Sequence, residues 1–122
     1  MLKFSAYLSL CDSIKDINHR YKVADKEVMV LDIVVKKHLE QEQFRVLDLI
    51  LLSQIASQAT LHNVMTQLIS KKLLETEPSL QDGRVKFVKP TTLALNRLAE
   101  CDQAVMSCSD GAADVSRLTT AL

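Results

Sequence analysis

The sequence predicts a mainly helical domain of the α+β class that contains one small β-hairpin. All of the Gly and Pro residues lie beyond residue 77, so the long stretch before them lacks the two strongest helix breakers. Residues 84–89 alternate charged side chains with β-branched or aromatic ones, which is typical of a short strand. Elsewhere, apolar residues recur at spacings of three and four, which indicates helices. A chain of 122 residues with 48% hydrophobic content can build one core, so we expect a single domain over residues 1–122.

The first expected helix lies between residues 4 and 21. Its apolar side chains are separated alternately by three and four residues, which places them on one helix face, and Asn18 occupies the polar position in that face. The face consists of Phe4, Tyr7, Cys11, Ile14 and Tyr21.

The second expected helix covers residues 25–39. Its many β-branched residues favour a strand, but the apolar spacing of three and four continues for longer than strands usually last. The residues in this pattern are Val28, Leu31, Val35 and Leu39. Polar residues 40–43 then form a connector, and a short apolar run follows over residues 44–52.

A third clear helical pattern begins at Ser57, which is a plausible N-cap. Its apolar face contains Leu61, Val64, Met65 and Leu68. Turn-forming residues 78–83 and the strand at 84–89 complete a hairpin. Thr91 and Thr92 can then cap a last helix that continues to about Ser107.

This order of elements predicts a winged helix-turn-helix over residues 26–91. A short helix, a longer helix with a polar free face and a hairpin follow one another directly. Residues 1–22 and 92–122 flank this core as expected dimerisation helices, because together they carry more apolar surface than so small a core needs. In the second flank the apolar spacing continues across Gly111 through Ala94, Leu98, Cys101, Val105, Cys108, Ala112 and Val115.

Within the predicted core the sequence resembles the MarR family of transcriptional regulators over roughly residues 26 to 92. The matching stretches are residues 59–74, which begin Ala-Thr-Leu and end Leu-Leu, then Asp82-Gly83-Arg84 and Pro90-Thr91. The chain departs from the family pattern at Lys72, where a Gly is usual, and at Gly83, where a second Arg is common. The first departure predicts a chain reversal that uses a non-Gly residue, at a modest cost if that residue is left-handed.

The resemblance implies a dimeric regulator that binds double-stranded DNA, with the helix at about 57–72 in the major groove and the wing at 75–89 on the minor groove. Amide side chains on such a helix can pair with adenine, while cations hold phosphates. The wing Arg84 is implied to reach the minor groove, with Asp82 paired to it or to the backbone. The candidate DNA-contacting residues are Ser57, Gln58, Thr60, His62, Asn63, Thr66, Gln67, Lys71, Asp82, Arg84 and Lys86. A solvated face of an ordinary amphipathic helix, and an ordinary hairpin turn at residues 82–83, would give the same pattern.

Charge leaves a second functional class open. Lys and Arg together number 15, as do Asp and Glu, so the net charge is zero and any electrostatic argument is local. Residues 57–91 contain five basic and three acidic residues, whereas residues 25–52 contain four basic and six acidic ones. The local excess favours DNA at the predicted recognition helix and wing. The alternative is a winged helix that acts as a protein–protein interaction adaptor without binding DNA.

Other functions have no signal in the sequence. We expect no enzyme, cofactor or metal site, since the chain has no phosphate-binding loop, nucleophile motif or ligand spacing around His19, His38 and His62. Three cysteines without a CxxC pair fit a reducing compartment, and buried structural thiols are favoured over redox sensing by Cys11. With no signal peptide or membrane span in the pattern, a cytoplasmic location is expected. The identity of any small-molecule effector stays open.

Overall fold

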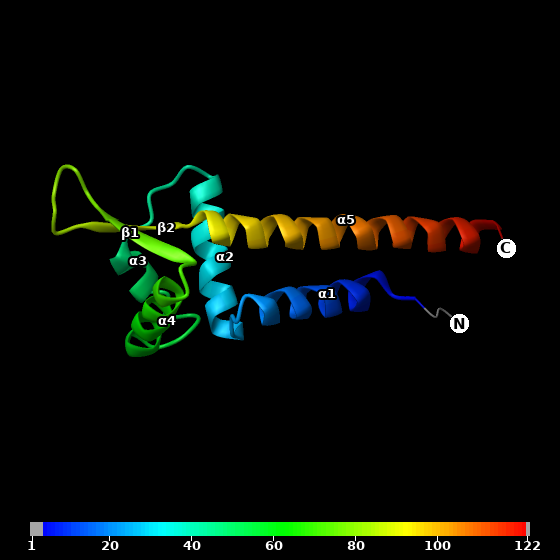
Figure 1. Cartoon of the computed structure of the whole chain (residues 1–122), viewed down its shortest axis with the longest axis horizontal. Helices are drawn as coiled ribbons and strands as arrows, with labels where there is room; N and C mark the ends of the chain where they lie inside the picture. The colour runs from blue at the N-terminus through cyan, green and yellow to red at the C-terminus, as the bar shows by residue number, and fades with distance from the viewer. Residues whose placement is uncertain (1–3, 122) are drawn as a thin grey trace. The chain divides into compact units, whose positions relative to one another are not determined.

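The computed structural model describes residues 4–121, with side chains described from residue 4 to residue 108. Five helices and two strands follow one another in this part of the chain (Figure 1). They are α1 (Ala6–Arg20), α2 (Asp25–Leu39), α3 (Val46–Ile50), α4 (Gln58–Ser70), β1 (Leu74–Pro78), β2 (Lys86–Pro90) and α5 (Thr92–Ala121). The predicted fold class, mainly helical with one antiparallel hairpin, is therefore confirmed.

The chain divides into two compact units. One contains residues 1–22 and 97–122, and the other, here called the winged unit, contains residues 23–96. The first turn of α5 thus belongs to the winged unit, so the division between the two units falls inside a helix.

Helix α2 forms the centre of the winged unit and packs against both α4 and β2. Its buried apolar residues are Val30, Leu31, Val34 and Val35, which recur at helical spacing. The helix predicted from spacing is confirmed, and its β-branched residues are accommodated because most of them lie in the core, where packing outweighs intrinsic propensity.

A third extended segment, which the sequence analysis missed, joins the hairpin to the helices. The Val88 N–H donates to the carbonyl of Phe44 at 2.7 Å, and Arg45 forms an isolated antiparallel bridge with Phe87. The apolar run at 44–52 is consequently shared between this bridge and the short helix α3. A one-residue bridge leaves no periodic pattern, so the sequence carried no signal for it.

The hairpin pairs Leu74 with Pro90 at its base and Pro78 with Lys86 at its outer end. The predicted strand at 84–89 is corrected, because β2 begins at Lys86 and the two residues before it belong to the tip. There, the Arg84 N–H donates to Asp82 Oδ1 at 3.0 Å and the Val85 N–H donates to the Asp82 carbonyl at 3.0 Å. These bonds form a turn that ends the strand pairing.

Lys72 reverses the chain between α4 and β1 in the left-handed region, with φ of 62°, as the departure from the family's Gly predicted. The turn is closed by a hydrogen bond from the Leu73 N–H to the Leu68 carbonyl at 2.9 Å. Thr91 fixes the other side, since its hydroxyl donates to the Lys72 carbonyl at 2.7 Å and accepts from the Ala94 N–H at 3.2 Å. One threonine therefore caps α5 and holds the end of α4.

The second unit pairs α1 with the part of α5 beyond residue 96, and Figure 1 shows the two running side by side in opposite directions. Asn18 Oδ1 accepts from Nε and Nη2 of the buried Arg97 at 2.9 and 2.7 Å, which explains the polar residue in the predicted apolar face. Glu100 accepts from the Tyr21 hydroxyl and pairs with Arg20 at 2.8 Å. The hydrogen bond from Tyr21, followed by the one from Arg20, lowers the pKa of Glu100.

The predicted apolar face of α1 requires correction. Ile17, which is not part of that pattern, is the residue of α1 that is buried, while Tyr7 is 72% exposed. The expectation of buried thiols holds only for Cys108, since Cys11 and Cys101 are half-buried. Helix α5 also continues well past the predicted end at Ser107. The side chains of Ala112 and Val115, which complete the predicted second apolar face, lie outside the described residues.

Because Lys72 has a positive φ, its identity should affect stability through the backbone alone. We expect Lys72→Gly to exceed Lys72→Ala in free energy of unfolding by about 1 kcal/mol, since only the alanine has a Cβ in the left-handed region. Both variants remove the same charge, so each controls for the other in urea denaturation. Equal stabilities would contradict the left-handed assignment.

Candidate nucleic-acid interface

Helix α4 is held by its apolar face and presents its polar face outward. Ser57 caps the helix, accepting from the Thr60 N–H at 3.3 Å, as predicted. The buried residues are those predicted from the spacing, namely Leu61, Val64, Met65 and Leu68. The opposite face is therefore fixed in space by the core.

The polar side chains of α4 form two groups. Some hydrogen-bond within the helix, and others have no hydrogen-bond partner among the described residues. The Ser57 hydroxyl donates to Thr60 Oγ1 at 3.0 Å, and the Thr66 hydroxyl donates to the His62 carbonyl at 2.9 Å. These hydroxyls serve the helix itself. Among the candidate DNA-contacting residues of α4, the exposed ones whose side chains have no hydrogen-bond partner among the described residues are Gln58, His62, Asn63 and Gln67. Three of these four are amides, the side-chain type suited to adenine edges.

Lys71, a candidate for phosphate contact, lies instead in an ion pair within the winged unit. Its Nζ is 2.7 and 2.8 Å from the two carboxylate oxygens of Glu27, whose side chain is only 9% exposed. Glu27 Oε1 also accepts from the Ala24 N–H at 2.9 Å, at the start of α2. This geometry gives Lys71 a positioning role within the winged unit, because its ammonium group is already paired with a carboxylate.

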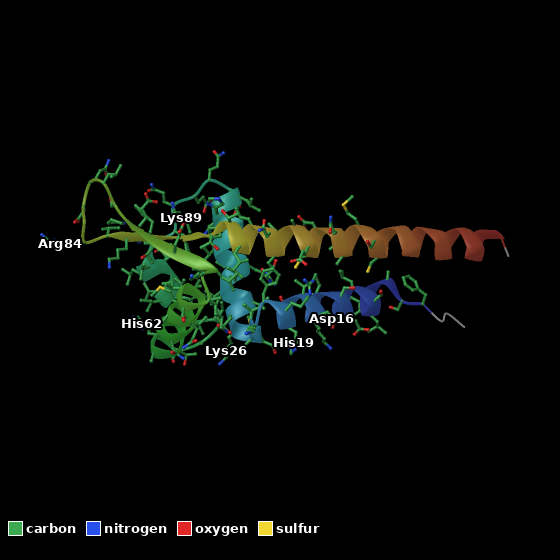
Figure 2. All side chains as sticks on the ribbon, viewed as in Figure 1. Asp16, His19, Lys26, His62, Arg84 and Lys89 are labelled. Carbon is green, nitrogen blue, oxygen red and sulfur yellow. The ribbon has the colours of Figure 1, made fainter. Side chains whose placement is uncertain are left out.

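The basic residues of the hairpin differ in whether an acidic side chain lies beside them. Lys89 lies 3.0 Å from a carboxylate oxygen of Glu77 and 3.7 Å from one of Glu75, and Glu77 is the main cause of its raised pKa. In the described part of the chain, Arg84 and Lys86 have exposed side chains without a carboxylate partner. Figure 2 shows Arg84 at the far end of the hairpin and His62 on α4. Asp82 bonds to the backbone of Arg84, which is one of the two pairings expected for it.

The structure thus brings most of the predicted residues into one unit, on α4 and on the hairpin that follows it. Arg84, Lys86 and the exposed Lys72 supply positive charge, while the α4 amides supply donors and acceptors. Sequence reasoning missed Lys72 as a member of this set, although its basic character and its place in the turn were both visible. Nothing in the printed sequence indicated that Lys71 would pair with the carboxylate of Glu27, 44 residues away.

Two other properties of the described residues bear on function. No group of three or more His, Cys, Asp or Glu side chains in this part of the chain is placed to hold a metal ion. Among the same residues, none of the helices combines the length and the apolar character needed to cross a membrane.

Several solved structures have a similar fold. The chain matches Staphylococcus aureus MepR in a complex with DNA at a TM-score of 0.63 and 13% identity, covering 94% of this chain and 93% of that one. It matches the transcriptional regulator Tm0710 of Thermotoga maritima at a TM-score of 0.65 and 14% identity, over 95% and 74% of the two chains. NadR in complex with 4-hydroxyphenylacetate matches at a TM-score of 0.60 and 17% identity, over 94% and 84%.

These neighbours are MarR-family transcriptional regulators, so the winged-helix fold implied by the sequence resemblance is confirmed. No protein-family model matches the sequence. A comparison with curated proteins likewise finds no match.

The ion pair of Lys71 with Glu27 should show up in stability. Replacing Lys71 by Met leaves a mostly buried carboxylate without its cation, and we expect a loss of about 2 kcal/mol in the free energy of unfolding. Lys36→Met, at an exposed position of α2, is the control and should change stability by less than about 0.5 kcal/mol. The double variant Glu27→Gln with Lys71→Met should recover part of the loss in a double-mutant cycle. Additive losses would show that the two side chains do not interact.

Proposed function

We propose that this chain, which has the fold of the MarR-family regulators, is a transcriptional regulator that binds double-stranded DNA as a homodimer. In this proposal α4 enters the major groove and the hairpin contacts the adjacent minor groove. One observation carries it: a core-anchored helix exposes amides beside a hairpin that contains Arg84 and Lys86. Among the described residues, these amides have no hydrogen-bond partner and these two cations have no carboxylate partner. A neighbour with the same fold was solved in a DNA complex, which supports this arrangement.

The roles of the two elements differ in the proposal. Gln58, Asn63 and Gln67 distinguish bases, because amides form paired hydrogen bonds with an adenine edge. Arg84, Lys86 and Lys72 bind phosphates or the minor groove and add affinity for any sequence. His62 adds a donor or acceptor on the same face. With amides and no arginine on the reading face, half-sites relatively rich in adenine and thymine are favoured.

A dimer is proposed from exposed apolar side chains on the helical unit. Leu8 is 61% exposed and Met106 is 67% exposed, and Tyr7 and Val105 are exposed as well. Large apolar side chains left in water on both α1 and α5 are unfavourable and are typical of an interface. A two-fold dimer presents two copies of α4 in inverted orientation, so its site is an inverted repeat with half-sites about 10 base pairs apart or a multiple of that.

DNA binding is tested by fluorescence anisotropy of labelled duplexes at two salt concentrations. Arg84→Ala should weaken binding to specific and random duplexes alike, by roughly tenfold at low salt, and reduce the salt slope by about one. Asn63→Ala should instead reduce the difference between specific and random DNA, by roughly tenfold, through the loss of a paired base contact.

Two matched variants control this experiment. Lys36→Ala removes an exposed cation from α2, and Gln103→Ala removes an exposed amide from α5; neither should change binding. If the protein bound no duplex in a salt-dependent way, DNA binding would be excluded and the adaptor alternative would be favoured. The balance of three basic and three acidic residues in the hairpin region, residues 75–89, is the feature that fits that alternative.

The dimer is tested by sedimentation equilibrium at micromolar concentration. The wild-type chain should sediment as a dimer, and Leu8→Asp combined with Met106→Asp should give a folded monomer, because both side chains are exposed within the single chain. Leu39→Asp, at an exposed position of α2, is the control and should remain dimeric. A folded wild-type monomer would contradict the proposal.

A further inference from the structure

An apolar groove lies in the winged unit between α3 and the outer end of the hairpin. Its volume is about 300 Å³, and its apolar residues are Val46, Leu47 and Ile50 from α3 and Val85 from the hairpin tip. None of the candidate residues on α4 lines it. It is therefore separate from the base-reading face.

The apolar surface extends beyond the groove. Leu47 is 54% exposed, and Leu51, one helical turn further along, is 52% exposed. Polar side chains at these two positions would not disturb the core, since neither leucine is buried in it. Large apolar residues left in water next to a groove mark a surface that another molecule covers. The surface is longer than the groove alone, which favours a helical segment over a small molecule.

The charges around the groove indicate which charge the bound segment should carry. Arg45 is neutralised, because its Nη2 and Nε donate to the Asp48 carboxylate at 3.0 and 3.2 Å. Arg84 and Lys86 also line the groove and have no carboxylate partner among the described residues. An apolar floor with two uncompensated cations at one side is complementary to an amphipathic segment that carries carboxylates.

We propose that this groove binds an acidic amphipathic helix of a partner protein, with its apolar face on Leu47 and Leu51 and its carboxylates on Arg84 and Lys86. The consequence for regulation rests on the proposed function. Because the same two cations are assigned to DNA, a bound partner helix and duplex DNA compete for the wing. Binding of the partner then releases the protein from DNA.

The probe is a fluorescein-labelled synthetic peptide of about 14 residues, with Leu along one face of a helix and Glu beside it. Two control peptides have the same residues in scrambled order, or Lys in place of every Glu. The acidic amphipathic peptide should bind at least about tenfold more tightly than either control, by fluorescence anisotropy. Equal binding of all three peptides, or no binding of the first, would overturn the proposal.

Variants separate the groove from DNA binding. Leu47→Gln should weaken peptide binding about tenfold and leave affinity for duplex DNA unchanged, since Leu47 belongs to the groove and not to the DNA-contacting set. Leu39→Gln replaces a leucine of similar exposure, 62% against 54%, that lies outside the groove, and it should change neither affinity. Unchanged peptide affinity in Leu47→Gln would overturn the assigned site.

Competition is measured by adding unlabelled acidic peptide to a labelled duplex complex. Displacement from the wild type, and weaker displacement from Leu47→Gln, is the expected result. Formation of a ternary complex would overturn the competition. If no duplex bound at all, the proposed DNA function would fail, while the peptide titration would still decide whether the groove binds its helix.

Discussion

The winged unit depends on the hydrogen bond and the ion pair that the Glu27 carboxylate forms. The carboxylate accepts from the Ala24 N–H at the start of α2 and from Lys71 at the end of α4, so it joins two helix ends that are far apart in the sequence. The adjoining left-handed residue Lys72 starts the chain toward the hairpin, and Thr91 bonds to its carbonyl. The end of α4, the start of the hairpin and the start of α5 therefore meet at one place. A mostly buried carboxylate needs both a cation and a hydrogen-bond donor to be tolerated, and this site supplies each.

The basic residues of the winged unit differ in whether they have an acidic partner. Lys71 and Lys89 are held by acidic partners, and Arg45 is held by Asp48. The hydrogen bond from Arg45 is the main cause of the lowered pKa of Asp48, so this carboxylate stays charged and paired to a lower pH than an ordinary aspartate would. In the turn and the hairpin, Lys72, Arg84 and Lys86 are exposed and have no carboxylate partner among the described residues, so their positive charge is available to a polyanion. A chain of zero net charge can in this way present a local cationic edge.

Apolar spacing was sufficient to predict α2, the buried face of α4 and the order of elements, because core packing imposes a helical period on the sequence. The cap at Ser57 and the reversal at Lys72 were predictable for a similar reason, since each depends on a local backbone requirement. The bridge at Phe44 and Arg45, the pairing of Lys71 with Glu27 and the exposure of Tyr7 were not. All three depend on which segments meet in space, and one sequence without a structure does not contain that information. The location of the candidate site was therefore predicted from the sequence. Which of its side chains are ion-paired and which are exposed was not.

The two proposed ligands of the wing differ in how they depend on salt. DNA affinity arises largely from counterion release and falls steeply as salt rises. An acidic amphipathic helix shares the electrostatic contribution of Arg84 and Lys86, but it also buries apolar surface on Leu47 and Leu51, and salt does not weaken that contribution. Raising the salt concentration should therefore shift the protein from DNA toward the partner helix at fixed concentrations of both. In the proposed scheme one pair of cations serves two ligands, and the apolar leucines decide which of them remains bound.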